Sequence, residues 1–134
     1  MAFIRCGGGT AKLKATTLWS NSAPGSSFAA QTVNLSQSML DFDFIRVSFD
    51  YSASSAEGWS VIYSPSILYH ETVSLGARKD DSSSINDMRY RAMNGATSTT
   101  VSFTNSVQHT SSSQSTSASY IIPTSITGLK LVVE

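Results

Sequence analysis

The sequence predicts an all-β protein, an antiparallel β-sandwich with a jelly-roll-like arrangement, on three observations. Short segments with alternating apolar and polar residues recur at intervals of roughly 10 to 15 residues. No helical segment of useful length separates them. Only 13% of the residues are charged, and Ser and Thr make up about three residues in ten. A hydroxyl-rich surface suits strands with one solvated face, whereas helical bundles normally carry many more charges.

A single domain preceded by a short arm is the expected organisation. At 134 residues the chain is long enough to bury one core without disulfides or metal. Phe3 and Ile4 are followed by three glycines at 7–9, which favour a hinge. The Lys-Ser or Lys-Thr of a phosphate-binding loop does not follow these glycines. We expect residues 1–10 to form a flexible N-terminal arm that docks on a neighbouring subunit, and 11–134 to form one β-sandwich domain.

The first half of the chain supplies four expected strands. Residues 11–19 alternate weakly, and residues 28–35 follow the turn signal Pro24-Gly25. Residues 36–43 lack β-branched side chains, which predicts one helical turn or a tight connector. Residues 44–52 and 59–63 alternate clearly and flank a small polar loop. The last two segments are therefore expected to pair as an antiparallel hairpin.

The second half supplies the remaining strands. Residues 68–75 are predicted as a strand after Pro65, and residues 76–87 as a long exposed loop. Residues 88–103 are predicted as a hairpin that turns at Asn94-Gly95, the strongest two-residue hairpin signal in the chain. The Ser-rich stretch 104–119 is expected to be either a mobile loop or a strand extension with hydroxyls on both faces. Two final apolar runs, 119–122 and 126–133, are separated by Pro123.

Charge and cysteine content exclude several classes of partner. The net charge is zero and the pI is about 6.7, so nucleic-acid binding is not expected. No apolar run approaches the roughly 18 residues needed to span a bilayer, and the N-terminus lacks the apolar core of a signal peptide. A lone Cys6 fits a protein made in a cytoplasm, since secreted domains that need disulfides carry paired cysteines.

The sequence does not point to catalysis, a metal or a cofactor. His70, His109 and Cys6 are too few and too scattered for a closed zinc site. Asp80, Asp81 and Asp87 do not have the spacing of a calcium loop, and Asp41 with Asp43 is better explained as a solvated turn. We therefore expect a protein that is not an enzyme. A hydrolase on the same scaffold would need an acidic pair or a triad gathered in a cleft.

Binding is easier to support, because aromatic rings beside hydrogen-bonding groups are typical of carbohydrate sites. Trp19 is the best single candidate for exposure, since it precedes the polar loop at 21–27. Packing in the core remains the alternative for each aromatic residue. The candidate ligand-binding residues are Trp19, Asn21, Trp59, Tyr69, Arg89 and Tyr90.

One stretch carries a Leu-Trp, an Asn and a Pro, then Ser-Phe-Ala-Ala-Gln-Thr, and later Leu-Ser and Phe-Asp-Phe-Ile before an alternating strand. This pattern, with the closing run at 120–130, resembles small β-sandwich modules of bacteriophage tail and virion structural proteins. The resemblance covers roughly a third of the chain and includes no catalytic motif. The matching residues are Leu18, Trp19, Asn21, Pro24, Ser27, Phe28, Ala29, Ala30, Gln31, Thr32, Leu35, Ser36, Phe42, Asp43, Phe44 and Ile45.

The resemblance implies a noncatalytic structural or adhesion protein of a tailed phage, made in the host bacterial cytoplasm and located in the virion. Its expected partners are other virion or tail subunits and further copies of itself, with a homotrimer favoured. Adhesion would take the form of binding to a host surface carbohydrate. The alternatives are a capsid decoration protein and a free-standing bacterial carbohydrate-binding module.

Overall fold

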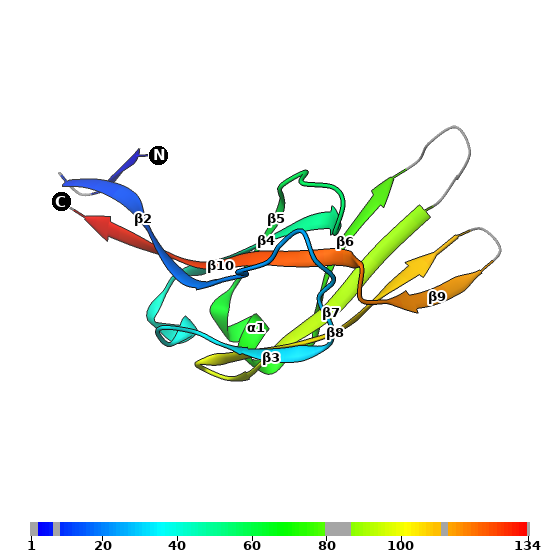
Figure 1. The fold of residues 1–134 in the computed structure, drawn as a ribbon. Coiled ribbons are helices and arrows are strands. Elements are labelled where there is room, and N and C mark those ends of the chain that lie inside the picture. Colours follow the sequence, from blue (N-terminus) through cyan, green and yellow to red (C-terminus); the bar gives the residue numbers. More distant parts are fainter. Residues whose placement is uncertain (1–2, 7–8, 80–86, 111–112, 134) are drawn as a thin grey trace.

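Two antiparallel sheets pack face to face, as the alternating segments predict (Figure 1). The computed structural model describes residues 3–6, 9–79, 87–110 and 113–133. The first sheet, here the β10 sheet, has the order β1 (Phe3–Cys6), β2 (Gly9–Ser20), β10 (Tyr120–Val133), β4 (Phe44–Ser52) and β5 (Trp59–Tyr63). The second, the β8 sheet, has the order β3 (Gln31–Asn34), β8 (Thr100–His109), β7 (Asp87–Thr97) and β6 (Val73–Lys79), and β9 (Gln114–Ser117) also pairs with β8.

Most of the expected strands of the first half are confirmed. β4 buries every second residue, and it pairs with β5 in the predicted hairpin. The segment 36–43 contains one 3-10 turn, η1 (Met39–Asp41), in which the hydroxyl of Ser38 accepts a hydrogen bond from the amide of Leu40. Phe3–Cys6, within the expected arm, pair with the start of β2.

The strand predicted over 68–75 is wrong in its first half, where a short helix, α1 (Pro65–His70), stands instead. Pro65 occupies the first helical turn, where its missing amide hydrogen costs no hydrogen bond and its fixed φ suits the helix. Leu68 lies within this helix and is fully buried, and the strand begins only at Val73. That strand continues to Lys79, and Asp87 already belongs to β7, so the predicted exposed loop over 76–87 is also wrong at both of its ends; 80–86 lie outside the described residues.

The hairpin of β7 and β8 is confirmed, but its turn lies at 98–99 and not at Asn94-Gly95. Gly95 is part of β7, where α1 and η1 approach the backbone closely. A Cβ atom there would lie 2.8 Å from Cε of Met39 and 3.1 Å from the carbonyl oxygen of Leu68. The glycine therefore serves close packing and not chain reversal.

The Ser-rich stretch 104–119 is largely β-structure, so the strand-extension alternative is confirmed over its described parts. β8 runs to His109 and β9 pairs back onto it. Pro123 does not split the last segment either, because β10 runs from Tyr120 to Val133 with an irregular register between Pro123 and Ser125. A β-bulge is one of the few places where a sheet tolerates proline.

The two sheets overlap only in part, and each extends beyond the other at opposite ends (Figure 1). The ends of β2 and β10 project at one end, near the chain termini, and we call residues 11–15 with 129–133 the β10 overhang. The ends of the β6–β7 and β8–β9 pairs project at the other, and we call residues 76–78, 88–90 and 106–109 with β9 the β8 overhang. The apolar core fills the overlap between them, around Val47, Phe49, Leu75, Val101 and Ile126, and it reaches Ala77 at the base of the β8 overhang.

Candidate ligand groove on the β8 sheet

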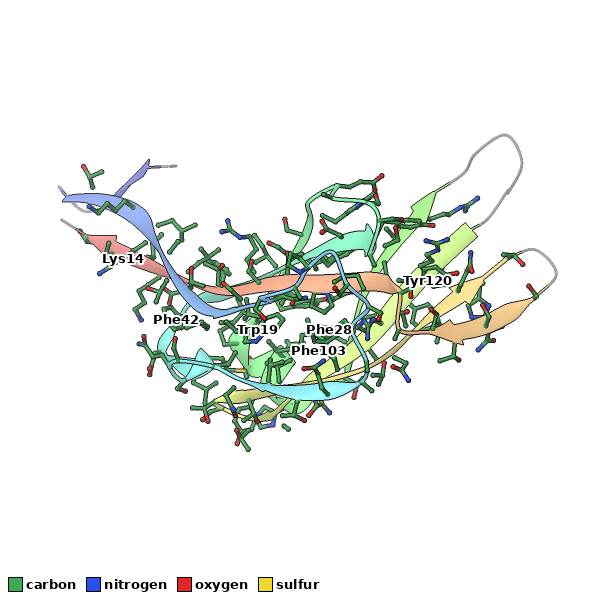
Figure 2. All side chains as sticks on the ribbon, in the orientation of Figure 1. Lys14, Trp19, Phe28, Phe42, Phe103 and Tyr120 are labelled. Atoms are coloured by element: carbon green, nitrogen blue, oxygen red, sulfur yellow. The ribbon has the colours of Figure 1, made fainter. Side chains whose placement is uncertain are left out.

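The structure does not bring the six sequence-predicted site residues together. Trp19 is half-buried, and its ring packs at the edge of the core, with centroids 6.0 Å from Phe28 and 6.1 Å from Phe103 (Figure 2). The Asn21 amide nitrogen donates to the carbonyl of Pro123, and its oxygen accepts from the amide of Ala23. The expectation that Trp19 is the most exposed candidate is therefore wrong, and Asn21 has a structural role.

Three more of these residues lie apart from one another. Trp59 is exposed at the edge strand β5, where its indole nitrogen donates to the Glu57 carboxylate at 2.9 Å. Tyr69 is half-buried on α1. Arg89 points to the inner side of the β8 sheet, and its guanidinium carbon lies 3.8 Å from the ring centroid of Tyr120 and 4.5 Å from that of Tyr51. These contacts stabilise the fold through cation–π attraction.

Of the six candidates, Tyr90 lines a hollow on the outer face of a sheet. Strand alternation places Leu75 and Ala77 in the core, so Ser74, Gly76 and Arg78 face outward on β6. Their neighbours on β7 are Tyr90, opposite Gly76, and Met88, opposite Arg78. The same rows continue across β8 and β9, from Tyr90 to Val107 and Thr116 and from Met88 to His109 and Gln114.

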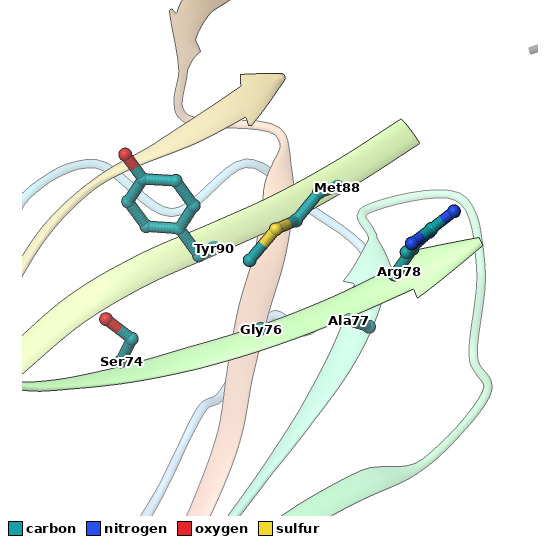
Figure 3. A pocket seen from close by; sticks show the side chains of 6 residues that line it. All are labelled: Ser74, Gly76, Ala77, Arg78, Met88 and Tyr90. Carbon is teal, nitrogen blue, oxygen red and sulfur yellow. The ribbon is translucent and has the colours of Figure 1, made fainter. Parts of the chain in front are cut away.

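The hollow is a groove of about 490 Å³ whose floor is Gly76 (Figure 3). A side chain would fit tightly at this position, because a Cβ atom there would lie 3.3 Å from Cβ of Tyr90 and 3.2 Å from the carbonyl oxygen of Arg89. Tyr90, Met88 and Ser74 stand around this floor, and Arg78 lies farther along β6. A smaller hollow of about 170 Å³, bordered by Ala92, Asn94, Ser102 and Thr104, continues along β7 on the same face.

The ring of Tyr90 is held in place by its neighbour on β8. The His109 ring lies nearly parallel to it, at 16° and 5.8 Å between centroids, and Nε2 of His109 is 3.5 Å from the Tyr90 hydroxyl oxygen. At the other end of the groove, the Tyr63 hydroxyl donates to the Ser74 carbonyl at 2.6 Å, and burial raises the pKa of Tyr63. These contacts position Ser74 of β6 and the ring of Tyr90 on β7, which line the groove.

The groove offers an apolar base with polar groups at its rim. Met88 and Tyr90 supply flat or flexible apolar surface, and the hydroxyls of Ser74 and Tyr90 can donate and accept hydrogen bonds. This combination suits a sugar ring, whose C–H face packs on an aromatic ring while its hydroxyls need polar partners. No group of three His, Cys, Asp or Glu side chains that could hold a metal ion occurs among the described residues.

Sequence reasoning missed Ser74, Gly76, Arg78 and Met88 as groove residues. The predicted strand ended at residue 75 and the predicted loop began at 76, so residues 76–79 were not considered as part of a strand. Leu75 and Ala77 are nevertheless spaced as core residues of one strand. That spacing was the available signal.

The fold defines the chain as an all-β protein of two packed antiparallel sheets. Neither a protein-family model nor a curated protein nor a solved structure matches it. Across the residues that the structure describes, none of the helices is long and apolar enough to cross a membrane.

Proposed function

We propose that the chain is a noncatalytic structural and adhesion subunit of a phage virion, associated with the tail, and that it binds a glycan in the β6–β7 groove. The groove carries the adhesion part of this proposal, because an aromatic wall, an apolar floor and rim hydroxyls converge there. The virion part rests on the resemblance of residues 18–45 and 120–130 to phage tail modules.

The ligand that fits best is a linear oligosaccharide. The groove at Tyr90 and the smaller hollow at Asn94 lie on the same face of β7, four residues apart along one strand. Four strand residues span roughly 13 Å, longer than a single sugar ring. The second hollow is lined by Asn94, Ser102 and Thr104, whose amide and hydroxyl groups match sugar hydroxyls.

Screening on a glycan array, followed by titration of the isotope-labelled protein with each oligosaccharide that binds, tests the adhesion. We expect amide signals of β6 and β7 to shift, and Tyr90→Ala to weaken binding at least about tenfold through loss of the aromatic wall. Trp59→Ala is the matched control, since it removes an exposed aromatic residue outside the groove. Loss of binding with Trp59→Ala but not with Tyr90→Ala would place the ligand elsewhere.

Mass spectrometry of purified virions tests the location. The chain should be present in stoichiometric amounts with tail subunits. A chain that binds oligosaccharides but is absent from virions would be a free-standing carbohydrate-binding module, for which the same groove would serve.

A further inference from the structure

The two hollows on the outer face of the β8 sheet differ in charge. Arg78, an exposed cation, lines the groove of Tyr90 at the end that lies away from Asn94 (Figure 3). The described residues that border the smaller hollow are all uncharged: Thr72, Ala92, Met93, Asn94, Ser102, Phe103 and Thr104. A ligand that fills both hollows therefore meets a cation at one end and neutral amide and hydroxyl groups at the other.

Arg78 belongs to a cross-strand row next to the floor of the groove. It pairs with Met88 of β7, which pairs in turn with His109 of β8. Gly76 lies two residues earlier on β6, so about 7 Å of strand separates the floor from the Arg78 position. Because arginine carries its charge on a long aliphatic stem, the guanidinium can reach a charged substituent of a ring that packs on Tyr90.

Two further arginines lie behind the groove. Arg89 and Arg91 alternate with Tyr90 along β7, and their guanidinium groups lie on the inner side of the sheet. Arg91 donates to three backbone carbonyls, which are neutral acceptors. These dipoles stabilise the charge of Arg91 without cancelling it, so it adds to the positive potential at the outer face.

The described strands around the groove contain no acidic residue that would offset these charges. Asp and Glu are absent from the segments 74–78, 88–92, 106–109 and 114–117. Lys79 and Asp87, register partners at the end of β6 and β7, have opposite charges, and Asp80 and Asp81 lie outside the described residues. The described part of the groove is thus positive at one end, in a chain whose net charge is zero.

We propose that the groove binds an oligosaccharide with an acidic sugar beside a neutral one, and that Arg78 holds the acidic group. The acidic sugar packs on Tyr90, and the neutral sugar lies at Asn94. A guanidinium presents five N–H donors in a planar fork, which matches a carboxylate or a phosphate and leaves donors for other contacts. This inference rests on the proposed glycan groove and adds the class of sugar that it takes.

Binding of paired glycans to the full chain tests the acidic group. Oligosaccharides that alternate a uronic acid with a neutral sugar are compared with their carboxyl-reduced forms, and phosphate-bearing oligosaccharides with their dephosphorylated forms. We expect the acidic member to bind about fivefold more tightly at about 20 mM salt, the size of the effect of a solvent-exposed ion pair. At about 500 mM salt, screening should bring the two affinities together.

The variant Arg78→Gln keeps a polar side chain and removes the charge. It should lower the affinity for the acidic oligosaccharide about fivefold and leave that for the uncharged one within about twofold of the parent. Arg46→Gln is the matched control, because it removes a guanidinium from β4 of the other sheet and should bind both members as the parent does. The salt series on the parent chain carries the test if Arg78→Gln does not fold.

The outcomes separate this inference from the proposed function. Equal affinity for acidic and uncharged oligosaccharides, or an acid preference that survives Arg78→Gln, overturns the inference and leaves a groove for neutral glycans. A preference for the phosphate-bearing probes that Arg78→Gln removes supports the anionic class and identifies the ester as its source. A chain that binds no glycan of the array overturns both.

Discussion

Both overhangs turn cationic side chains to the inner side of their sheets, but their outer faces carry different side chains. In the β10 overhang, aliphatic residues such as Leu131 and Val133 face outward and Lys14 and Lys130 face inward. In the β8 overhang, Tyr90 and His109 face outward with hydroxyl and amide neighbours, while Arg89 faces inward between two tyrosine rings. A flat aliphatic surface suits another protein surface, whereas rings beside hydroxyls suit a small polar ligand.

The overhangs also join the body in different ways. At the root of the β10 overhang, the Phe42 ring packs directly on Gly128, an apolar contact with no room for a side chain. At the root of the β8 overhang lies Arg91, whose guanidinium is fully buried. It donates to three backbone carbonyls, those of Ile121 at 2.7 Å, Thr104 at 2.6 Å and Tyr120 at 2.9 Å. Close apolar packing therefore connects the β10 overhang to the body of the fold, whereas hydrogen bonds connect the β8 overhang to it.

Arg91 stabilises the point where the chain crosses from the β8 sheet to the β10 sheet. Ile121 there has a φ of 46°, a left-handed conformation that is unfavourable for a β-branched residue. Burial lowers the pKa of Arg91 to about 10, so the guanidinium remains charged at neutral pH and donates all of these bonds. The buried charge is thus compensated by carbonyl dipoles that also fix a strained bend.

The largest expected effect comes from Arg91→Met. The substitution keeps much of the side-chain volume but leaves the carbonyls of Thr104, Tyr120 and Ile121 without their donor. Each unsatisfied buried carbonyl costs about 1–3 kcal/mol, and relief of the desolvated charge offsets part of the sum, so we expect a loss of about 3–5 kcal/mol. Urea denaturation measures the free energy of unfolding.

The control for Arg91→Met is Lys14→Met, which removes an exposed cation of the other overhang. This change should stay within about 0.5 kcal/mol of the parent. If both variants are equally stable, the three carbonyls find other donors. The hydrogen bonds of Arg91 then do not stabilise the attachment of the β8 overhang.

A smaller effect is expected from Gly128→Ala at the root of the β10 overhang. The new Cβ would lie 2.5 Å from Cγ of Phe42, too close for any real contact, so the buried ring must move. Overpacking of this kind costs about 1–3 kcal/mol. A second change, Phe42→Leu, should recover part of that loss because it removes the face of the ring.

Gly25→Ala is the control for this glycine, because a Cβ atom at Gly25 would meet nothing within 4 Å. Its effect on the midpoint of thermal unfolding should be close to zero or slightly stabilising. A Gly128→Ala protein as stable as the Gly25→Ala protein would mean that the Phe42 ring is free to rotate away.

The fold class and most strands were predictable because alternation of residue type follows alternation of burial, most regularly along β4 and the first half of β8. The helix α1 and the position of the β7–β8 turn were not predictable, because in both places tertiary packing decides between two locally allowed conformations. Pro65 started a helix where the pattern favoured a strand, and Gly95 was needed for close approach of α1 where the dipeptide favoured a turn. Neither choice is visible without the neighbouring element.

The candidate site was predictable only in part. Aromatic content suggested a sugar surface, and Tyr90 does line the groove, but Trp19 and Asn21 are engaged in the body of the fold. The groove depends on Gly76 opposite Tyr90, a cross-strand register that the sequence does not state. Strand register follows from turn geometry and from which face of the strand is buried. Because residues 76–87 were predicted as a loop, no strand pairing was assigned to Gly76.

The smallest effect concerns Tyr63, which ties the edge of β5 to the β6 strand of the groove. Tyr63→Phe removes one hydrogen bond to the Ser74 carbonyl and should cost about 0.5–1.5 kcal/mol at neutral pH. Burial raises the pKa of Tyr63 above its ordinary value of 10.0, so the folded state keeps the phenol proton more tightly than the unfolded state. The contribution of the protonated Tyr63 side chain to stability is fully present below pH 10. It is lost as the pH rises through the pKa that Tyr63 has in the folded state. Urea midpoints measured from pH 8 upward should therefore converge for the parent and Tyr63→Phe above pH 10, and a constant difference would contradict the link between burial and this bond.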